Sequence, residues 1–181
     1  KMTKRIIFEK GKVGDFLEGD IPSRVVEDPA PTVRWTSTKI PYPLWRSVMT
    51  FFISHKSEEV CVYLMLHRIT KTWHIFVPEQ TVTGASVNIT HGEDVHAALK
   101  DHDLVGNIHT HPGFGAFMSH IDEGSEHTTD GVYITIGKLD NQIAESDIRT
   151  FLSGYCYKNL PPLEDLVENP CPEFIDRDTF S

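Results

Sequence analysis

The sequence predicts an α/β protein with a single domain, in which a β-sheet carries helices on its faces. The almost continuous apolar run over residues 59–66 has the composition of a strand that is covered on both sides, and a second, shorter apolar run begins a strand predicted over 104–110. Residues 44–55 have their apolar side chains at helical spacing. Strand-like and helix-like segments alternate with several short connections, which is typical of a sheet packed against helices. The 181 residues are enough for one domain with a substantial core.

The first 40 or so residues are predicted to be an extension with little regular structure. Residues 4–9 have the pattern of a short strand, whereas residues 10–34 combine Gly, Pro and Asp with few apolar runs and predict mostly loop. The helix over 44–55 follows Pro41 and Pro43, and proline is favoured in the first turn of a helix. Its apolar positions form one face, which we expect to lie in the core.

Further elements follow the strand at 59–66 at short intervals. Residues 72–77 predict a second strand that ends at Pro78, and residues 80–90 predict a third, interrupted by Gly84. A helix is predicted from His91 to about Lys100, ahead of the strand at 104–110. The remaining predicted elements are a short helix over 119–127, a strand over 132–136 and one or two strands within 141–157.

Composition narrows the class of protein. The formal net charge of −9 argues against a nucleic-acid binder and against a surface made for anionic membranes. No apolar run approaches the roughly 18 residues needed to span a bilayer. The three cysteines, Cys61, Cys156 and Cys171, are an odd number without a Cys-x-x-Cys pair, which favours the reducing cytoplasm. Residues 161–181 are acidic and contain several prolines, so we expect a surface or disordered tail after a domain over 1–160.

The candidate functional site lies at the end of the second apolar run. His109 and His111 stand one residue apart there, and side chains at i and i+2 of a strand point to the same face. A Pro-Gly-Phe-Gly loop follows, and then Ser119 and Asp122 form a Ser-x-x-Asp sequence that is typical of a helix N-terminus. Such a loop can return a carboxylate to two imidazoles. Two His nitrogens and one carboxylate oxygen are a catalytic zinc set that leaves a fourth position for water.

This spacing resembles the JAMM motif of the MPN+ (JAB domain) zinc metalloproteases. That motif reads Glu, a long gap, His-(Ser/Thr)-His, seven residues, Ser, two residues and Asp, and residues 109–122 match its second part throughout. The family's glutamate stands at the start of a buried strand; Glu59 occupies that place here, with Glu58 as the alternative. The resemblance covers about residues 44–138 and implies the three-layer MPN fold, with a mixed sheet between helices.

The resemblance also implies a function. Relatives in this family are Zn²⁺ proteases that cut the isopeptide or peptide bond after a ubiquitin-like modifier, so a modifier or its conjugate is the expected partner. His109, His111 and Asp122 would bind zinc, Glu59 would be the general base for the metal-bound water, and Ser119 would donate a hydrogen bond to the oxyanion. The alternatives are another peptidase of this type, for modifier maturation or in phage tails, and an MPN scaffold without catalysis. The histidines without ligand spacing are expected to be ordinary: His55, His67, His74, His91, His96 and His102.

Overall fold

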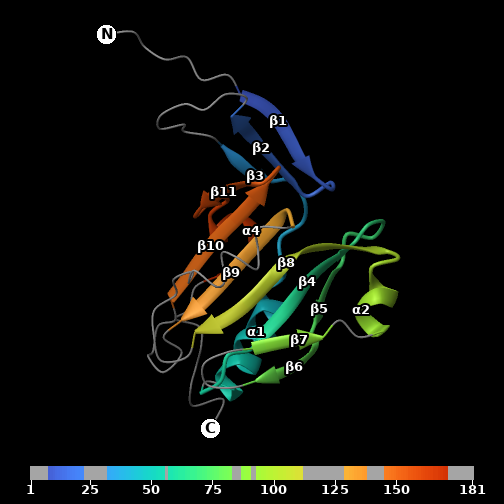
Figure 1. Ribbon diagram of the computed structural model, residues 1–181, viewed down its shortest axis with the longest axis vertical. Coiled ribbons are helices and arrows are strands. Elements are labelled where there is room, and N and C mark those ends of the chain that lie inside the picture. The colour runs from blue at the N-terminus through green and yellow to red at the C-terminus, as the bar shows by residue number, and fades with distance from the viewer. Residues whose placement is uncertain are drawn as a thin grey trace.

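A six-stranded mixed sheet forms the centre of the computed structural model, which describes residues 8–22, 32–55, 57–82, 87–90, 93–111, 129–137 and 145–170. Its strands are β4 (Cys61–His67), β5 (Trp73–Phe76), β8 (His102–His111), β9 (Gly131–Gly137), β10 (Glu145–Leu152) and β11 (Tyr155–Lys158). The strand order is β11-β10-β9-β8-β4-β5 (Figure 1). β8 and β9 are parallel and the other neighbouring pairs are antiparallel. The mixed sheet of the predicted fold class is therefore confirmed.

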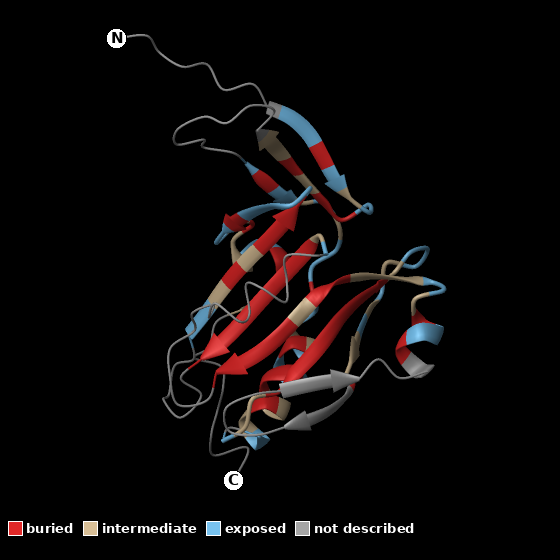
Figure 2. Ribbon diagram, viewed as in Figure 1, coloured by how far each residue is buried: buried red, intermediate tan, exposed pale blue. Residues whose placement is uncertain are grey.

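One face of this sheet is covered by α1 (Tyr42–Ser54), which agrees with the helix predicted over 44–55. Pro43 lies in the first turn, where a missing backbone N–H leaves no hydrogen bond unmade. The buried face of the helix packs with alternate residues of the central strands: Trp45, Val48, Met49 and Phe52 lie in one cluster with Val62, Leu64, Ile108 and Ile134. Figure 2 shows β4, β9 and the second half of β8 buried, as expected for strands at the middle of a sheet.

The residues between these positions face the opposite side of the sheet, because strand side chains alternate. Cys61, Tyr63 and Met65 of β4 pack there with Val95 and Ala98 of α2 (Glu93–Ala98), which is shorter than the helix predicted to end near Lys100. Among the described elements, α1 is the helix that extends across a sheet face, and α2 touches the sheet near one end. The predicted three-layer arrangement with helices on both faces therefore stays a prediction.

The N-terminal region contradicts the prediction that residues 10–34 are mostly loop. It contains a three-stranded antiparallel sheet in the order β1-β2-β3, formed by β1 (Phe8–Val13), β2 (Leu17–Pro22) and β3 (Val33–Trp35). The turn between β1 and β2 includes Gly14, whose φ of 49° suits glycine. After this turn, the side chains of Phe16, Leu17 and Val33 are buried in the main hydrophobic core. Of the strand predicted over 4–9, residues 4–7 lie outside the described part of the chain.

The connection between β5 and β8 holds a two-stranded antiparallel hairpin of β6 (Glu79–Val82) and β7 (Val87–Thr90). The prediction of one interrupted strand over 80–90 thus becomes two paired strands. After β8, the strand β9 matches the strand predicted over 132–136, and the one or two strands predicted within 141–157 correspond to β10 and β11. No helix within the described residues is long and apolar enough to span a membrane.

Residues 161–170, predicted to begin a surface or disordered tail, have a defined structure in which Leu166 and Val167 reach the core while the acidic side chains stay exposed. The segment includes α4 (Leu163–Leu166), and Leu166 and Val167 are fully buried. Ile40 N donates a hydrogen bond to Leu166 O at 2.8 Å, and Glu168 N donates one to Ile40 O at 3.0 Å. These bonds attach the segment to the chain ahead of α1. The rest of the predicted acidic tail, 171–181, lies outside the described residues.

Candidate metal centre

The two histidines of the predicted zinc set lie side by side at the end of β8. His109 and His111 are 7% and 2% exposed, and their ring centroids are 5.1 Å apart with an interplanar angle of 61°. Two imidazoles bound to one tetrahedral zinc at about 2.0–2.1 Å have ring centres about 5 Å apart. The spacing of the rings therefore fits a shared ion.

Neighbouring strands hold this pair in place from both sides. His109 is opposite Cys61 of β4 and opposite Thr135 of β9. The fully buried Thr135 hydroxyl lies 3.3 Å from His109 Nε2, within hydrogen-bonding distance. Metal-binding histidines characteristically have such a partner on one ring nitrogen, which fixes the tautomer and the rotation of the ring. Thr135 is thus suited to orient His109 as a ligand.

The position of Glu59 relative to the histidines depends on the pairing of β4 with β8. Thr110 N donates a hydrogen bond to Val60 O at 3.0 Å, which continues the β4–β8 ladder beyond the Cys61–His109 pair towards Glu59 and His111. Val60 packs in the cluster beneath α1. In an extended segment the residue before it points to the opposite face, which is the face of the histidines. By this alternation we expect the side chain of the half-buried Glu59 on the histidine side of the sheet.

Glu58, the alternative base, is held elsewhere. Its carboxylate oxygen Oε2 lies 3.1 Å from Nδ1 of His55 at the end of α1, and both side chains are close to half exposed, at 45% and 44%. Glu58 N also donates a hydrogen bond to His55 O at 3.0 Å. These contacts tie Glu58 to the solvent side of the helix end, so the geometry favours Glu59 over Glu58 beside the histidines.

The other two predicted site residues, Ser119 and Asp122, lie outside the described residues, as does the helix predicted over 119–127. Within the parts of the chain that the structure describes, no three His, Cys, Asp or Glu side chains form a group that could hold a metal. The structure describes two of the three predicted ligands, the imidazole pair, which fits zinc in residue type and spacing. The third ligand stays the predicted Asp122.

Two further residues on this face were missed by sequence reasoning. Tyr63 is opposite Asn107, which precedes His109 by two positions and shares its face. Burial, with a smaller contribution from Cys61, raises the pKa of Tyr63 to about 12. The buried Asn107 Oδ1 has no hydrogen-bond partner among the described residues. The alternation 107, 109, 111 is the signal in the sequence that could have placed Asn107 on the site's face.

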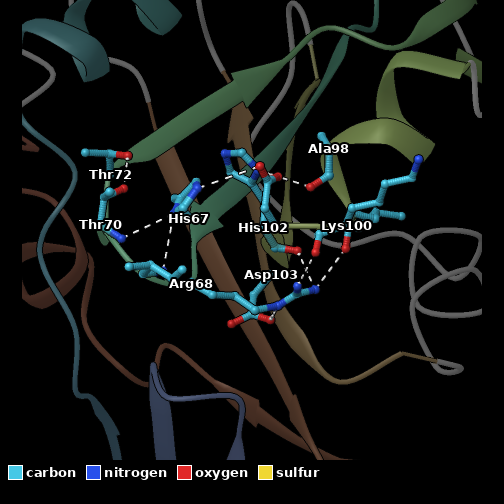
Figure 3. Close-up of polar contacts among 11 residues, drawn as sticks. His67, Arg68, Thr70, Thr72, Ala98, Lys100, His102 and Asp103 are labelled. Atoms are coloured by element: carbon cyan, nitrogen blue, oxygen red, sulfur yellow. Dashed lines mark hydrogen bonds and ion pairs between the residues drawn. The ribbon is translucent and has the colours of Figure 1, made fainter.

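A second group of histidines lies at the opposite end of β4 and β8, where His67 pairs with His102 (Figure 3). Nδ1 of His67 accepts hydrogen bonds from the backbone N–H groups of Ile69 and Thr70, both at 3.2 Å. Nδ1 of His102 donates to Asp101 Oδ1 at 2.6 Å, and this bond holds the pKa of the Asp101 carboxyl below its usual value. These ring nitrogens therefore take part in hydrogen bonds within the fold.

Arg68 completes this second cluster. Its guanidinium group donates to the carbonyl oxygens of Leu99, Lys100 and His102 at 2.8, 2.6 and 3.1 Å, and it pairs with Asp103 at 3.1 Å (Figure 3). The carbonyl groups that follow a helix lack intrahelical partners, and here they find them on one side chain. The cluster therefore fastens the end of α2 to the turn between β4 and β5.

Comparison with known proteins identifies no family for this chain. No family model matches the chain, and no curated protein matches it.

Proposed function

We propose that this chain is a cytoplasmic zinc metalloprotease of the JAMM type, with the three-layer MPN fold, that hydrolyses the isopeptide or peptide bond after a ubiquitin-like modifier. The observation that carries the proposal is the buried pair His109 and His111, at a spacing suited to one zinc ion, with the Glu59 segment bonded to the residue between them. The sequence supplies the two remaining members of the motif, Ser119 and Asp122, at the family's spacing.

Each residue of the motif has a separate role. His109, His111 and Asp122 would hold Zn²⁺, which when bound supplies an acidified water and polarises the scissile carbonyl. The Glu59 carboxylate takes a proton from the attacking water and returns it to the nitrogen of the leaving amine. The Ser119 hydroxyl donates a hydrogen bond to the oxygen that gains negative charge. Water is thus added across the carbon–nitrogen bond, with hydroxide on the acyl carbon and the proton on the amine.

The first test measures metal content and cleavage together. Elemental analysis of the purified chain at neutral pH should give one zinc per molecule. The probes are ubiquitin joined to a fluorescent lysine peptide by an isopeptide bond, and the same ubiquitin as a linear fusion. Chelation should abolish cleavage and added Zn²⁺ should restore it. Cleavage of the linear fusion alone would favour modifier maturation, and a chain without zinc would favour the non-catalytic scaffold.

A matched pair of variants tests the role of the glutamate. Glu59→Gln should keep zinc and lower kcat by about 10²–10⁴-fold, because the proton acceptor is lost and the side chain is nearly isosteric. Glu58→Gln makes the same chemical change one residue away, on the carboxylate held by His55, and should leave kcat near the wild-type value. Full activity in Glu59→Gln, or the loss appearing in Glu58→Gln, would contradict the assignment.

A further inference from the structure

The residue between the two histidines has a hydrogen-bonding role that its place in the motif does not reveal. The side chain of Thr110 points away from the imidazoles, towards the side of the sheet covered by α1, because strand side chains alternate. It is 1% exposed, so its hydroxyl depends on protein partners. Those partners are both in the segment that leads from α1 into β4.

The Thr110 hydroxyl bridges the two peptide groups of Glu59. Oγ1 accepts a hydrogen bond from Val60 N at 2.9 Å, and that N–H belongs to the peptide bond after Glu59. Oγ1 also donates to Glu58 O at 3.3 Å, and that carbonyl belongs to the peptide bond before Glu59. A third bond, from Thr110 N to Val60 O at 3.0 Å, aligns the same segment. One side chain therefore fixes the backbone on both sides of the glutamate.

We propose that Thr110 is a positioning residue that sets where the Glu59 carboxylate stands relative to His109 and His111. The inference builds on the proposed function, since it assigns to Thr110 the placement of the general base. Thr110 is covalently joined to both histidines, so its hydroxyl links the glutamate to the pair directly, without an intervening side chain. Catalytic groups need such placement, because a displacement of about 1 Å can cost on the order of 10²-fold in rate.

Two substitutions separate positioning from simple stabilisation. Thr110→Val removes the hydroxyl and keeps the branched shape, and Thr110→Ser keeps the hydroxyl and removes the methyl group. Thr110→Ala removes the same hydroxyl with less bulk and replaces the valine variant should that variant not fold. All measurements use the full chain at a temperature well below the unfolding transition of every variant.

The first readout is amide hydrogen exchange by NMR and needs neither metal nor substrate. Exchange at Val60 N–H should accelerate by roughly fivefold or more in Thr110→Val, because the acceptor is gone, and stay near wild type in Thr110→Ser. The amide of His67, which donates to Thr72 O at the other end of β4, is the internal control and should not change. Equal Val60 exchange in the wild type and in Thr110→Val would overturn the inference.

The second readout is kinetic and uses the isopeptide-linked ubiquitin probe with the zinc-loaded chain. Thr110→Val should lower kcat by about 10- to 100-fold, with KM and zinc content within about twofold of wild type. Thr110→Ser, which keeps the hydroxyl, should have a kcat near the wild-type value. Faster Val60 exchange without a lower kcat would reduce Thr110 to a structural residue and overturn the positioning role. A wild-type chain with neither zinc nor cleavage would overturn the proposed function, while the exchange result would still decide whether Thr110 holds the Glu59 segment.

Discussion

Replacing Gly106 by alanine tests the parallel pairing of β8 with β9, on which the geometry of the histidine pair depends. Gly106 is opposite Val132 in that pairing, and a Cβ added at Gly106 would overlap the carbonyl oxygen of Val132 and stand 2.6 Å from its carbonyl carbon. Backbone cannot rotate aside as a side chain can, so the two strands must separate locally. On its other side β8 pairs with β4, and that pairing has a bulge at Val105, next to Gly106. The alanine would therefore disturb a point where the hydrogen-bond ladder is already irregular.

The expected cost comes from two sources. Separating the strands loses one or two ladder hydrogen bonds at about 1 kcal/mol each, and forcing atoms into a packed site costs about 1–3 kcal/mol. A total near 3 kcal/mol corresponds to a decrease in Tm of roughly 6–12 °C for a chain of this length.

Gly154→Ala is the control for this experiment. Gly154 has a φ of 81°, and no described atom lies within 4 Å of its added Cβ, so alanine there meets backbone strain without a clash. That strain costs about 1–2 kcal/mol. Thermal unfolding followed by circular dichroism, on both variants and the wild type, gives the comparison. A Gly106→Ala chain that loses no more stability than Gly154→Ala would refute the close approach of β8 and β9.

Two other predictions concern side chains on the face of the histidines. Because the pKa of Tyr63 is raised from 10.0 to about 12, its neutral form stabilises the fold fully below pH 10, and this stabilisation is lost as the pH rises towards 12. The difference in 295 nm absorbance between the wild type and Tyr63→Phe should titrate near pH 12, and a midpoint near 10 would contradict the burial of the phenol. Thr135→Val removes the hydroxyl beside His109 Nε2 and should weaken zinc binding by about 10–100-fold in competition with a chromophoric chelator, whereas Thr135→Ser should bind as the wild type does. Equal affinity in the valine and serine variants would show that this contact does not orient the ligand.

The parts of the fold that the sequence predicts are those whose signal is local. α1 is predicted by the helical spacing of its apolar residues, because one face of the helix packs in the core. β4 is predicted by its apolar run, because six of its seven residues are buried. β8 is predicted by the shorter apolar run that begins at Leu104. The N-terminal sheet has no such apolar pattern. Its three strands carry charged residues, and Lys12, Glu18 and Arg34 lie opposite one another across the sheet and form exposed ion pairs. Its buried hydrophobic residues, Phe16, Leu17 and Val33, are few and do not form a continuous apolar run in the sequence.

The C-terminal segment shows the same limit. Residues 161–170 have the acidic, proline-containing composition of a tail, but Leu166 and Val167 are buried and the backbone of Ile40 forms hydrogen bonds with Leu166 and Glu168, which together attach the segment to the fold. The average composition of a segment does not predict the burial of two individual side chains within it. A pairing between residues so far apart in the chain is set by tertiary structure, which a local window does not contain.

The candidate site divides in the same way. The orientation of His109 and His111 follows from two-residue spacing within one strand and needs no further information. The approach of Glu59 depends on pairing between segments 50 residues apart, and the contact of Thr135 with His109 joins residues 26 apart. The sequence points to Glu59 only through its resemblance to a family motif, and it gives no indication of Thr135.

Crystals of the wild-type chain grown with Zn²⁺ and measured on both sides of the zinc absorption edge test the metal centre most directly. The proposed zinc site predicts one anomalous peak about 2.0–2.2 Å from a ring nitrogen of His109, a ring nitrogen of His111 and a carboxylate oxygen of Asp122, with the Glu59 carboxylate beside the remaining coordination position. A peak bound by other side chains, or no peak between the two imidazoles at saturating zinc, would contradict it.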